Sequence, residues 1–404
     1  MKKLFSDRFA ILCILIMAMT AGCGEDSATS QAVASNTINP VRFAYHTVAT
    51  RTDGTLWVWG YNGYGQLGNG TVLSASTPTQ IGTGATWAVI SAGSNHTAAI
   101  RTNGTLWTWG ANWFGQLGNG DNALASTSTP TQVGTGITWA SVAAGTFHTA
   151  SVKTDGTLWA WGYNDYGQLG NGDNALASLS TPTQVGTDVT WASVSAGKYH
   201  TVALKTSGSL WAWGYNGYGQ LGDGTLVSKN TPTQIGTATN WASVSAGGNY
   251  TAAVKTDGTL WAWGENFNGQ LGDGTDGASA ASPQQNDKQS PVKIGTAANW
   301  LSVSAGANHT AAIKTDGTLW VWGSNWVGQL GDGTTTFKNA PIQVGNDADW
   351  SSVSAETYYT VAVKTNGTLW VWGYNAYGQL GDGTTVDKNV PLKIGTATNW
   401  APRN

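Results

Sequence analysis

A glycine-rich stretch, TLWVWGYNGYGQLGNG at positions 55–70, contains the residues that could bind a phosphate group. A glycine-rich loop between a strand and a helix start can hold a phosphate through its backbone amides. However, the hexapeptide Gly-Gln-Leu-Gly-[Asn/Asp]-Gly occurs seven times, from 65–70 to 378–383, each time with strand-like sequence around it and no helical pattern. Because a phosphate loop is needed only once, the repetition indicates a structural turn.

The histidines are the candidate metal ligands, and all of them fall at one position of the repeat: His46, His96, His148, His200 and His309. Tyr250 and Tyr359 take this position in the other two copies, and threonine follows in all seven. A metal site needs three or four converging ligands, and tyrosine replaces a hydrogen-bonding ring better than it replaces a ligand. We therefore expect structural hydrogen bonds to the neighbouring turn, with no metal site and no cofactor.

Two glutamates, Glu265 and Glu356, are the candidate catalytic acids of the repeat region. Paired carboxylates could hydrolyse a glycosidic bond if they lay about 5–10 Å apart. These two belong to the fifth and seventh repeats, which argues against such closeness. We expect a protein that is not an enzyme, and a polysaccharide hydrolase is the weakest alternative.

A basic residue also recurs once per repeat, just before a predicted hairpin turn: Arg51, Arg101, Lys153, Lys205, Lys255, Lys314 and Lys364. Such a ring could attract an anionic surface. Exposed pairs of a lysine with a turn aspartate contribute little energy. We favour a solvated strand end beside the turn acid, as at Lys153 and Asp155.

The N-terminus predicts export from the cytoplasm. A basic start precedes an apolar run at 9–19 that is too short to span a bilayer. Thr20-Ala21-Gly22-Cys23 resembles a bacterial lipobox, although that pattern usually has leucine at the position of Thr20. We expect a lipoprotein-type signal peptide at 1–22, lipidation of Cys23 and a flexible tether at 23–40; the alternative is an ordinary secretory signal without a lipid.

Composition excludes several classes of protein. The chain has two cysteines, of which Cys13 lies in the signal, so the mature protein has no disulfide. From Cys23 onward there are 16 basic and 21 acidic residues, a net charge of −5. Nucleic-acid binding needs a basic face, so no nucleic acid is expected as a partner.

The elements that must position these residues follow from the repeat. Trp-x-Trp-Gly occurs seven times, first at Trp57, at spacings of 50, 52, 52, 50, 59 and 50 residues. In the unit at 241–294 we expect strands at 242–246, 250–256, 259–263 and 291–294, with a two-residue Asp-Gly hairpin turn of positive φ. A period near 50 with strand patterning predicts an all-β, seven-bladed β-propeller at 41–404, closed by 38–44 or by 401–404.

The repeat A-G-x-x-H-T-x-A-[LIV]-[KR]-T-[DN]-G-T-L-W-x-W-G-x-N-x-x-G-Q-L-G-[DN]-G, seen at 92–120 and 144–172, resembles the regulator of chromosome condensation repeat. The resemblance covers the chain after the tether and implies a seven-bladed propeller. Members of that family include a guanine-nucleotide exchange factor, a plant ultraviolet photoreceptor and a secreted inhibitor of β-lactamases, so the fold does not select a function. The photoreceptor's Gly-Trp-Arg-His-Thr is absent here, where Ser94-Asn95-His96 and Lys198-Tyr199-His200 stand.

The candidate binding surface is the end of the propeller where the Ala-Gly-x-x and x-Asn-x-x loops emerge, called the upper face below. The position after the asparagine is not fixed by the repeat, yet it carries large aromatic residues at Trp113, Phe267 and Trp326. Aromatic side chains dominate protein interfaces. We expect a binding site formed by Trp113, Phe114, Phe147, Asp165, Tyr199, Phe267, Trp326 and Tyr358.

The expected ligand of this face is a protein partner, bound by a monomeric propeller whose only membrane contact is the N-terminal lipid. A cell-surface glycan is the close alternative, because aromatic platforms also stack on sugars. A guanine-nucleotide exchange factor is the alternative by family analogy, and the predicted export signal argues against it.

Overall fold

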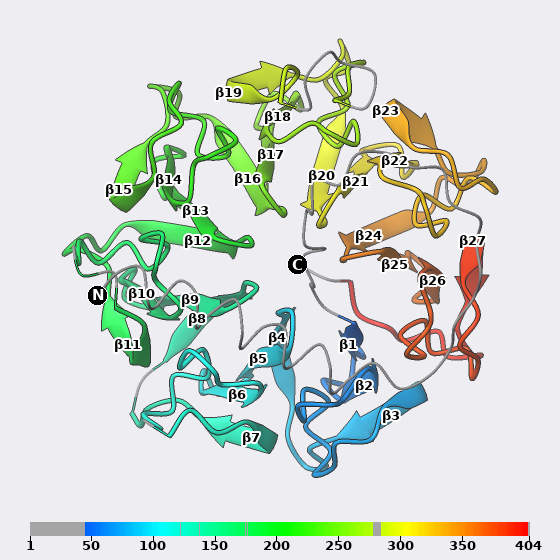
Figure 1. Cartoon of the computed structure of the whole chain (residues 1–404). Coiled ribbons are helices and arrows are strands. Elements are labelled where there is room, and N and C mark those ends of the chain that lie inside the picture. Colours follow the sequence, from blue (N-terminus) through cyan, green and yellow to red (C-terminus); the bar gives the residue numbers. More distant parts are fainter. Residues whose placement is uncertain are drawn as a thin grey trace, which may run out of the picture. The chain divides into compact units, whose positions relative to one another are not determined.

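Seven β-sheets surround a central axis in the computed structural model, which describes residues 45–402 except 122, 137, 174, 176 and 278–283 (Figure 1). The expected all-β, seven-bladed propeller with four-stranded blades is confirmed. The expected signal peptide at 1–22, Cys23, the expected tether at 23–40 and the segment 38–44 lie outside the described residues.

Each blade is an antiparallel meander, numbered one to seven along the chain. Blades one to three contain β1 (His46–Thr50), β2 (Leu56–Gly60), β3 (Ala75–Ile81), β4 (Trp87–Ala92), β5 (His96–Arg101), β6 (Leu106–Gly110), β7 (Thr127–Gln132), β8 (Trp139–Ala144), β9 (His148–Lys153), β10 (Leu158–Gly162) and β11 (Leu179–Gln184). Blades four and five contain β12 (Trp191–Ala196), β13 (His200–Lys205), β14 (Leu210–Gly214), β15 (Lys229–Gln234), β16 (Trp241–Ala246), β17 (Tyr250–Lys255), β18 (Leu260–Gly264) and β19 (Lys288–Lys293). Blades six and seven contain β20 (Trp300–Ala305), β21 (His309–Lys314), β22 (Leu319–Gly323), β23 (Lys338–Gln343), β24 (Trp350–Ala355), β25 (Tyr359–Lys364), β26 (Leu369–Gly373) and β27 (Lys388–Lys393).

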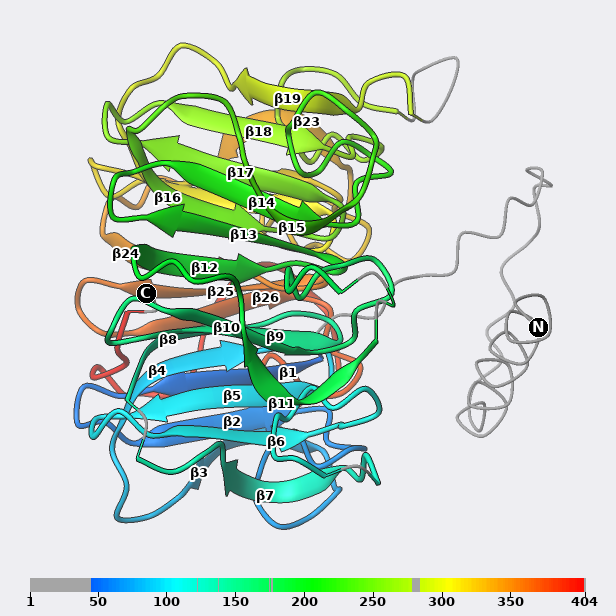
Figure 2. The same cartoon turned by 90° about the vertical axis from the view of Figure 1, so that its left-hand side faces the viewer.

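The strands run between the two ends of the propeller, as the side view in Figure 2 shows. In blade five the expected strands match β16 to β19, with the last beginning three residues earlier than expected, at Lys288. In every blade the third strand ends at a glycine, such as Gly264, which pairs with the first residue of the fourth strand. The loops after these glycines therefore emerge at the upper face.

The hairpins at the opposite end differ from the expected two-residue turn. The amide of Gly54 donates to the carbonyl of Arg51 at 2.9 Å, and the amide of Arg51 donates to the carbonyl of Thr55 at 3.0 Å. The φ angle is positive at Gly54 (80°) but not at Asp53. The turn is thus a three-residue loop ending in a left-handed glycine, and Asp53 contributes a side-chain acceptor for Thr55.

The C-terminus closes the ring. Trp400 forms an isolated antiparallel bridge with Arg51, and the amide of Ala401 donates to the carbonyl of Thr50 at 2.9 Å. The end of the chain thereby supplies the inner strand that β1–β2–β3 lacks, as the red segment beside β1 shows in Figure 1. Closure by the C-terminal segment, one of the two expected routes, is therefore observed through Trp400 and Ala401, and it covers the inner edge of blade one.

The hydrophobic core consists of seven clusters, each shared by two adjacent blades. One cluster joins Val48, Leu56 and Val58 of blade one to Trp87 and Trp109 of blade two. The second tryptophan of each Trp-x-Trp pair is fully buried, and in six of the seven pairs its indole donates to a glutamine carbonyl of the preceding blade, as from Trp109 to Gln66 at 2.9 Å. The repeat pattern predicts that both tryptophans of a pair are buried, because neighbouring blades cover both faces of a blade; the structure corrects this, since the first tryptophan of each pair is only half-buried.

Candidate functional site

The upper face carries aromatic rings over five of the seven blades, in two groups of contacting rings that are joined by the chain neighbours Trp113 and Phe114. Four contacts join neighbouring blades, with ring centres 4.6–4.9 Å apart: Tyr377–Tyr61, Tyr64–Trp113, Phe114–Tyr163 and Tyr166–Tyr215. Contacts within blades and to the Ala-Gly-x-x loops extend the series to Tyr45, Phe147, Tyr199, Tyr218, Tyr358 and Tyr374. We call these fourteen residues the aromatic arc; it runs from blade seven through blades one to three and ends in blade four.

A repeat rule explains where the arc forms and where it stops. The ring two positions after the loop asparagine of one blade meets the ring just before, or just after, the asparagine of the next blade. Blades five and six carry no ring before the asparagine or two positions after it, where Glu265, Ser324, Asn268 and Val327 stand; their aromatic residues, Phe267 and Trp326, lie only just after the asparagine. The arc therefore ends where Tyr218 of blade four faces blade five.

The structure brings five of the eight expected binding residues into the arc: Trp113, Phe114, Phe147, Tyr199 and Tyr358. Asp165 is exposed within it and accepts a hydrogen bond from the hydroxyl of Tyr163 at 3.0 Å. Phe267 and Trp326 lie beyond its end, in blades five and six. Phe267 is half-buried, whereas Trp326 is 61% exposed.

The sequence suggested that the residue after the loop asparagine can vary freely. In the structure, however, the space for its side chain depends on the residue before the asparagine. In blades one and four the hydroxyls of Tyr61 and Tyr215 lie where a Cβ on Gly63 or Gly217 would stand, at 2.3 and 2.2 Å. Trp113, Phe267 and Trp326 occur only where alanine, glutamate or serine replaces that tyrosine. Each upper loop therefore presents an aromatic ring from one side of its asparagine or the other.

The expected binding residues did not include most of the tyrosines that recur at fixed repeat positions, so most of the arc was missed. Tyr61, Tyr64, Tyr166 and Tyr377 occur at fixed repeat positions, yet Tyr166 and Tyr377 are 37% and 38% exposed. The available signal was the pairing of an aromatic residue on each side of the Asn-x motif in consecutive blades. The same residues therefore both pack between blades and form the exposed surface.

Acidic groups gather where the arc ends. Glu265 stands at the repeat position of the arc tyrosines, and its Oε2 accepts from the Asn249 side chain at 3.1 Å. Burial raises the pKa of Glu265, and burial together with the Glu265 charge raises the pKa of Asp287 to about 7. Lys198 interacts electrostatically with Glu265, and burial lowers its pKa to about 8. Two carboxylates thus share a partly dry site, with Lys198 acting on Glu265 and Lys288 on Asp287.

Comparison with known families shows where this architecture belongs. The model of the RCC1-like domain matches residues 28–299, and models of the regulator of chromosome condensation (RCC1) repeat match 300–329, 350–379, 316–363 and 366–400. The chain belongs to the RCC1-like domain family. Among curated RCC1-family relatives, it is 32% identical over 181 residues to the Arabidopsis thaliana ultraviolet-B receptor UVR8 and 32% identical over 188 residues to the mitochondrial RCC1 domain-containing protein RUG3 of that plant.

These alignments cover 44% of the chain and 41% of each relative, so the chain spans less than half the length of the curated relatives it matches. Among solved RCC1-type structures, yeast RCC1 (Prp20) bound to Kap60 superposes with a TM-score of 0.75 at 22% identity, covering 93% of this chain and 91% of that one. Human WBSCR16 superposes with a TM-score of 0.74 at 21% identity, covering 85% and 95%. At these identities the structural likeness shows the RCC1 fold alone.

The histidines of the RCC1 repeat form an inter-blade belt. The Nε2 atom of His148 lies 2.9 Å from the hydroxyl of Thr201 in the next blade, and the hydroxyl of Tyr250 lies 2.9 Å from that of Thr310. The expected structural hydrogen bond is thus confirmed, although its partner is a strand threonine and not a turn. Burial lowers the pKa of His148 to about 3. Over the described ranges, no three histidine, cysteine, aspartate or glutamate residues gather as a metal site would require.

The basic residues of the RCC1 repeat lie on tryptophan rings, which corrects the expected solvated strand end. The guanidinium of Arg51 lies 3.9 Å from the centre of the Trp57 ring and 4.8 Å from that of Trp400. Each of the other six blades repeats this arrangement with an arginine or lysine. The cations therefore cover the half-buried indoles and are part of the scaffold.

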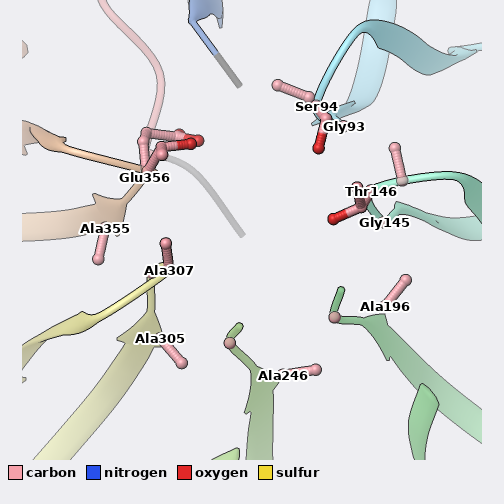
Figure 3. Close-up of a pocket in the computed structure, with 16 residues that line it drawn as sticks. Gly93, Ser94, Gly145, Thr146, Ala196, Ala246, Ala305, Ala307, Ala355 and Glu356 are labelled. Atoms are coloured by element: carbon pink, nitrogen blue, oxygen red, sulfur yellow. The ribbon is translucent and has the colours of Figure 1, made fainter. Parts of the chain in front are cut away.

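A small cavity lies on the propeller axis at the upper face and has a volume of about 100 Å³ (Figure 3). Its walls are the Ala-Gly loops, whose backbone groups bond between blades, as from the Thr146 amide to the Gly197 carbonyl at 3.3 Å. Glu356 is the one charged residue among its lining residues. This volume is well below the roughly 300–1,000 Å³ of a small-molecule site. In the part of the chain that the structure describes, no helix is long and apolar enough to cross a bilayer.

Proposed function

We propose that this RCC1-family propeller is an exported binding scaffold, anchored through a lipid on Cys23, that recognises a protein partner with its upper face. The observation that carries the proposal is the aromatic arc, which joins rings from five blades into one surface. Aromatic residues are enriched among interface anchors, because they bury much area at a small cost in conformational entropy. Trp326, exposed beyond the arc, adds a separate anchor.

The geometry supports binding better than catalysis. Glu265 is bound by Asn249 and Glu356 by Ser354, each within its own blade, so the two carboxylates have different partners. Solved relatives offer a consistent precedent, because yeast RCC1 is seen bound to the protein Kap60. The proposed role is therefore a non-enzymatic one.

A capture experiment tests this proposal. The chain from residue 24 onward serves as bait in an extract of the cell envelope, alongside the single variant Trp326→Ala and the triple variant Trp113→Ala, Phe267→Ala, Trp326→Ala. Val189→Ala is the matched control, because Val189 is 60% exposed on the opposite end of the propeller. We expect one protein retained by the wild type and the control and lost from the triple variant. Equal retention by all baits would contradict the assignment of the upper face.

Glycan binding is the second candidate, because exposed tyrosine rings beside carboxylates also suit sugar hydroxyls and sugar rings. An excess of soluble envelope polysaccharide added to the same assay separates the two candidates. Protein capture that survives the competitor supports a protein partner. Polysaccharide bound directly by the wild type, and not by the triple variant, would favour the glycan.

A further inference from the structure

The carboxylates around the aromatic arc greatly outnumber the free cations. On the upper face, Lys229, Lys288, Lys338 and Lys388 each lie 3.2–3.4 Å from an aspartate of the same blade and are thereby neutralised. Close to the arc, the described residues then include one further cation, Lys198, and four carboxylates: Asp165, Glu265, Asp287 and Asp387. The binding face is therefore both aromatic and acidic.

Asp165 forms the first of two sites suited to a cationic side chain. Its carboxylate is exposed in the middle of the arc and is held by the Tyr163 hydroxyl at 3.0 Å. The exposed ring of Tyr166 follows directly in the chain and packs on Tyr215, with ring centres 4.9 Å apart. A guanidinium or ammonium group above Tyr166 would gain both a cation–π contact and an ion pair with Asp165.

Glu265 and Asp287 form the second site, at the end of the arc. Glu265 interacts electrostatically with Tyr215 and Tyr218, and Asp287 with Tyr218. Asn249 fixes one oxygen of Glu265, and the Asn266 amide donates to Asp287 at 2.9 Å. Burial is the main cause of the raised pKa of Asp287, which the Glu265 charge raises further and Lys288 lowers, so a further cation placed beside this pair would stabilise the ionised carboxylates.

We propose that the partner of the upper face is a basic polypeptide segment, whose lysine or arginine side chains bind at Asp165 and at the Glu265–Asp287 pair while its remaining surface packs on the aromatic arc. This inference rests on the proposed function and adds the chemistry of the partner. The carboxylates at these two sites repel phosphate and sulfate groups, so the proposal disfavours nucleic acids, anionic lipid surfaces and acidic polysaccharides as ligands of this face.

The test measures binding of two synthetic peptides of equal length to the purified chain. One alternates arginine with leucine and tyrosine, and in the other glutamate replaces every arginine. We expect the basic peptide to bind and the acidic one not to bind, with affinity falling as salt rises from about 20 to 300 mM because exposed charges become screened. Asp165→Asn is expected to weaken binding about threefold, and Asp165→Asn with Glu265→Gln and Asp287→Asn about tenfold or more.

Asp188→Asn is the matched control, since it removes the same charge from an exposed aspartate on the opposite end. Unchanged affinity in this variant supports the inference. Equal weakening by Asp165→Asn and Asp188→Asn, or equal binding of the two peptides, would overturn it. If the peptide assay fails but the envelope assay still captures a protein through Trp113, Phe267 and Trp326, the proposed function is supported and the proposal of a basic partner is wrong. Failure of both assays, with binding of a neutral polysaccharide, would overturn both.

Discussion

The hydroxyl of Thr47 on β1 lies 3.0 Å from the hydroxyl of Tyr359 on β25, although the two residues are 312 positions apart. Tyr359 also donates to the carbonyl of His46 at 2.8 Å. These contacts repeat, across the junction of the first and last blades, the bonds that every other pair of neighbours makes. The belt is therefore a complete circle, and its closure relies on both ends of the repeat region.

Because the C-terminal residues close the ring, we expect their removal to reduce stability more than the loss of so short a segment would otherwise do. Removal of residues 400–404 deletes the buried Trp400 and the bridge to Arg51. Trp350→Ala is the matched control, since Trp350 is equally buried and lies within the chain. We expect the control to lower the free energy of unfolding by about 3–5 kcal/mol, and the truncation to lower it further by opening an edge. Urea unfolding followed by tryptophan fluorescence measures the free energy of unfolding of both variants. A smaller loss in the truncated chain than in the control would show that ring closure does not contribute to stability.

The histidine belt predicts loss of stability in acid. Burial lowers the pKa of His96, His148, His200 and His309 from 6.5 to about 3. Between these values the unfolded chain binds more protons than the folded chain, so stability is complete above pH 6.5 and falls as the pH drops toward 3. Each histidine contributes a slope of up to about 1.4 kcal/mol per pH unit.

His148→Tyr tests that account with a substitution that the repeat already contains. A tyrosine can reach Thr201 as Tyr250 reaches Thr310, and Gly145 stands beside the ring as Gly247 does beside Tyr250. We expect nearly unchanged stability at pH 7.5 and a lower midpoint pH of acid unfolding, measured by circular dichroism. An unchanged midpoint would mean that His148 does not govern acid unfolding.

The Gly-Gln-Leu-Gly turn predicts a large cost for any side chain at its second glycine. Gly331 has a φ of +70°, and a Cβ there would stand 2.6 Å from Nε1 of Trp372. Gly345 has a φ of +60° with nothing within 4 Å, so Gly345→Ala isolates the backbone strain, which is about 1–2 kcal/mol. Gly331→Ala should cost about 1–3 kcal/mol more, because the turn packs on the indole. Equal costs in urea unfolding would contradict that role.

The outer strands predict a coupled pair in blades four to seven. In these blades the aspartate that follows Gly-Gln-Leu-Gly forms an ion pair with the lysine that begins the fourth strand. In blades one to three, asparagine replaces the aspartate, and alanine, threonine or leucine replaces the lysine. Lys338→Thr should cost about 0.5–1 kcal/mol, and Asp332→Asn should recover much of it, because the double variant recreates the pattern of blade two. Additive costs in thermal unfolding, or no effect of salt on the coupling, would contradict the pairing.

Most of the fold was predictable because its signals are local. The Trp-x-Trp pattern, the glycines of the turns and the spacing near 50 residues lie within one repeat and recur seven times. They determine the strands, the blade and the number of blades, since each repeat buries its faces only against neighbours of the same kind. The three-residue hairpin was missed because Asp-Gly also suits a two-residue turn.

The sequence by itself determined a seven-bladed propeller and an upper face with aromatic loops, because repeated local patterns dictate repeated packing. Only the tertiary structure decided that Tyr166 meets Tyr215, that Tyr61 occupies the space beside Gly63, that Arg51 covers Trp57 and Trp400, and that Glu265 ends the arc. Apart from Arg51 with Trp57 and Tyr61 with Gly63, these contacts join side chains from different repeats. Radial packing of the blades, which no single repeat encodes, brings them together.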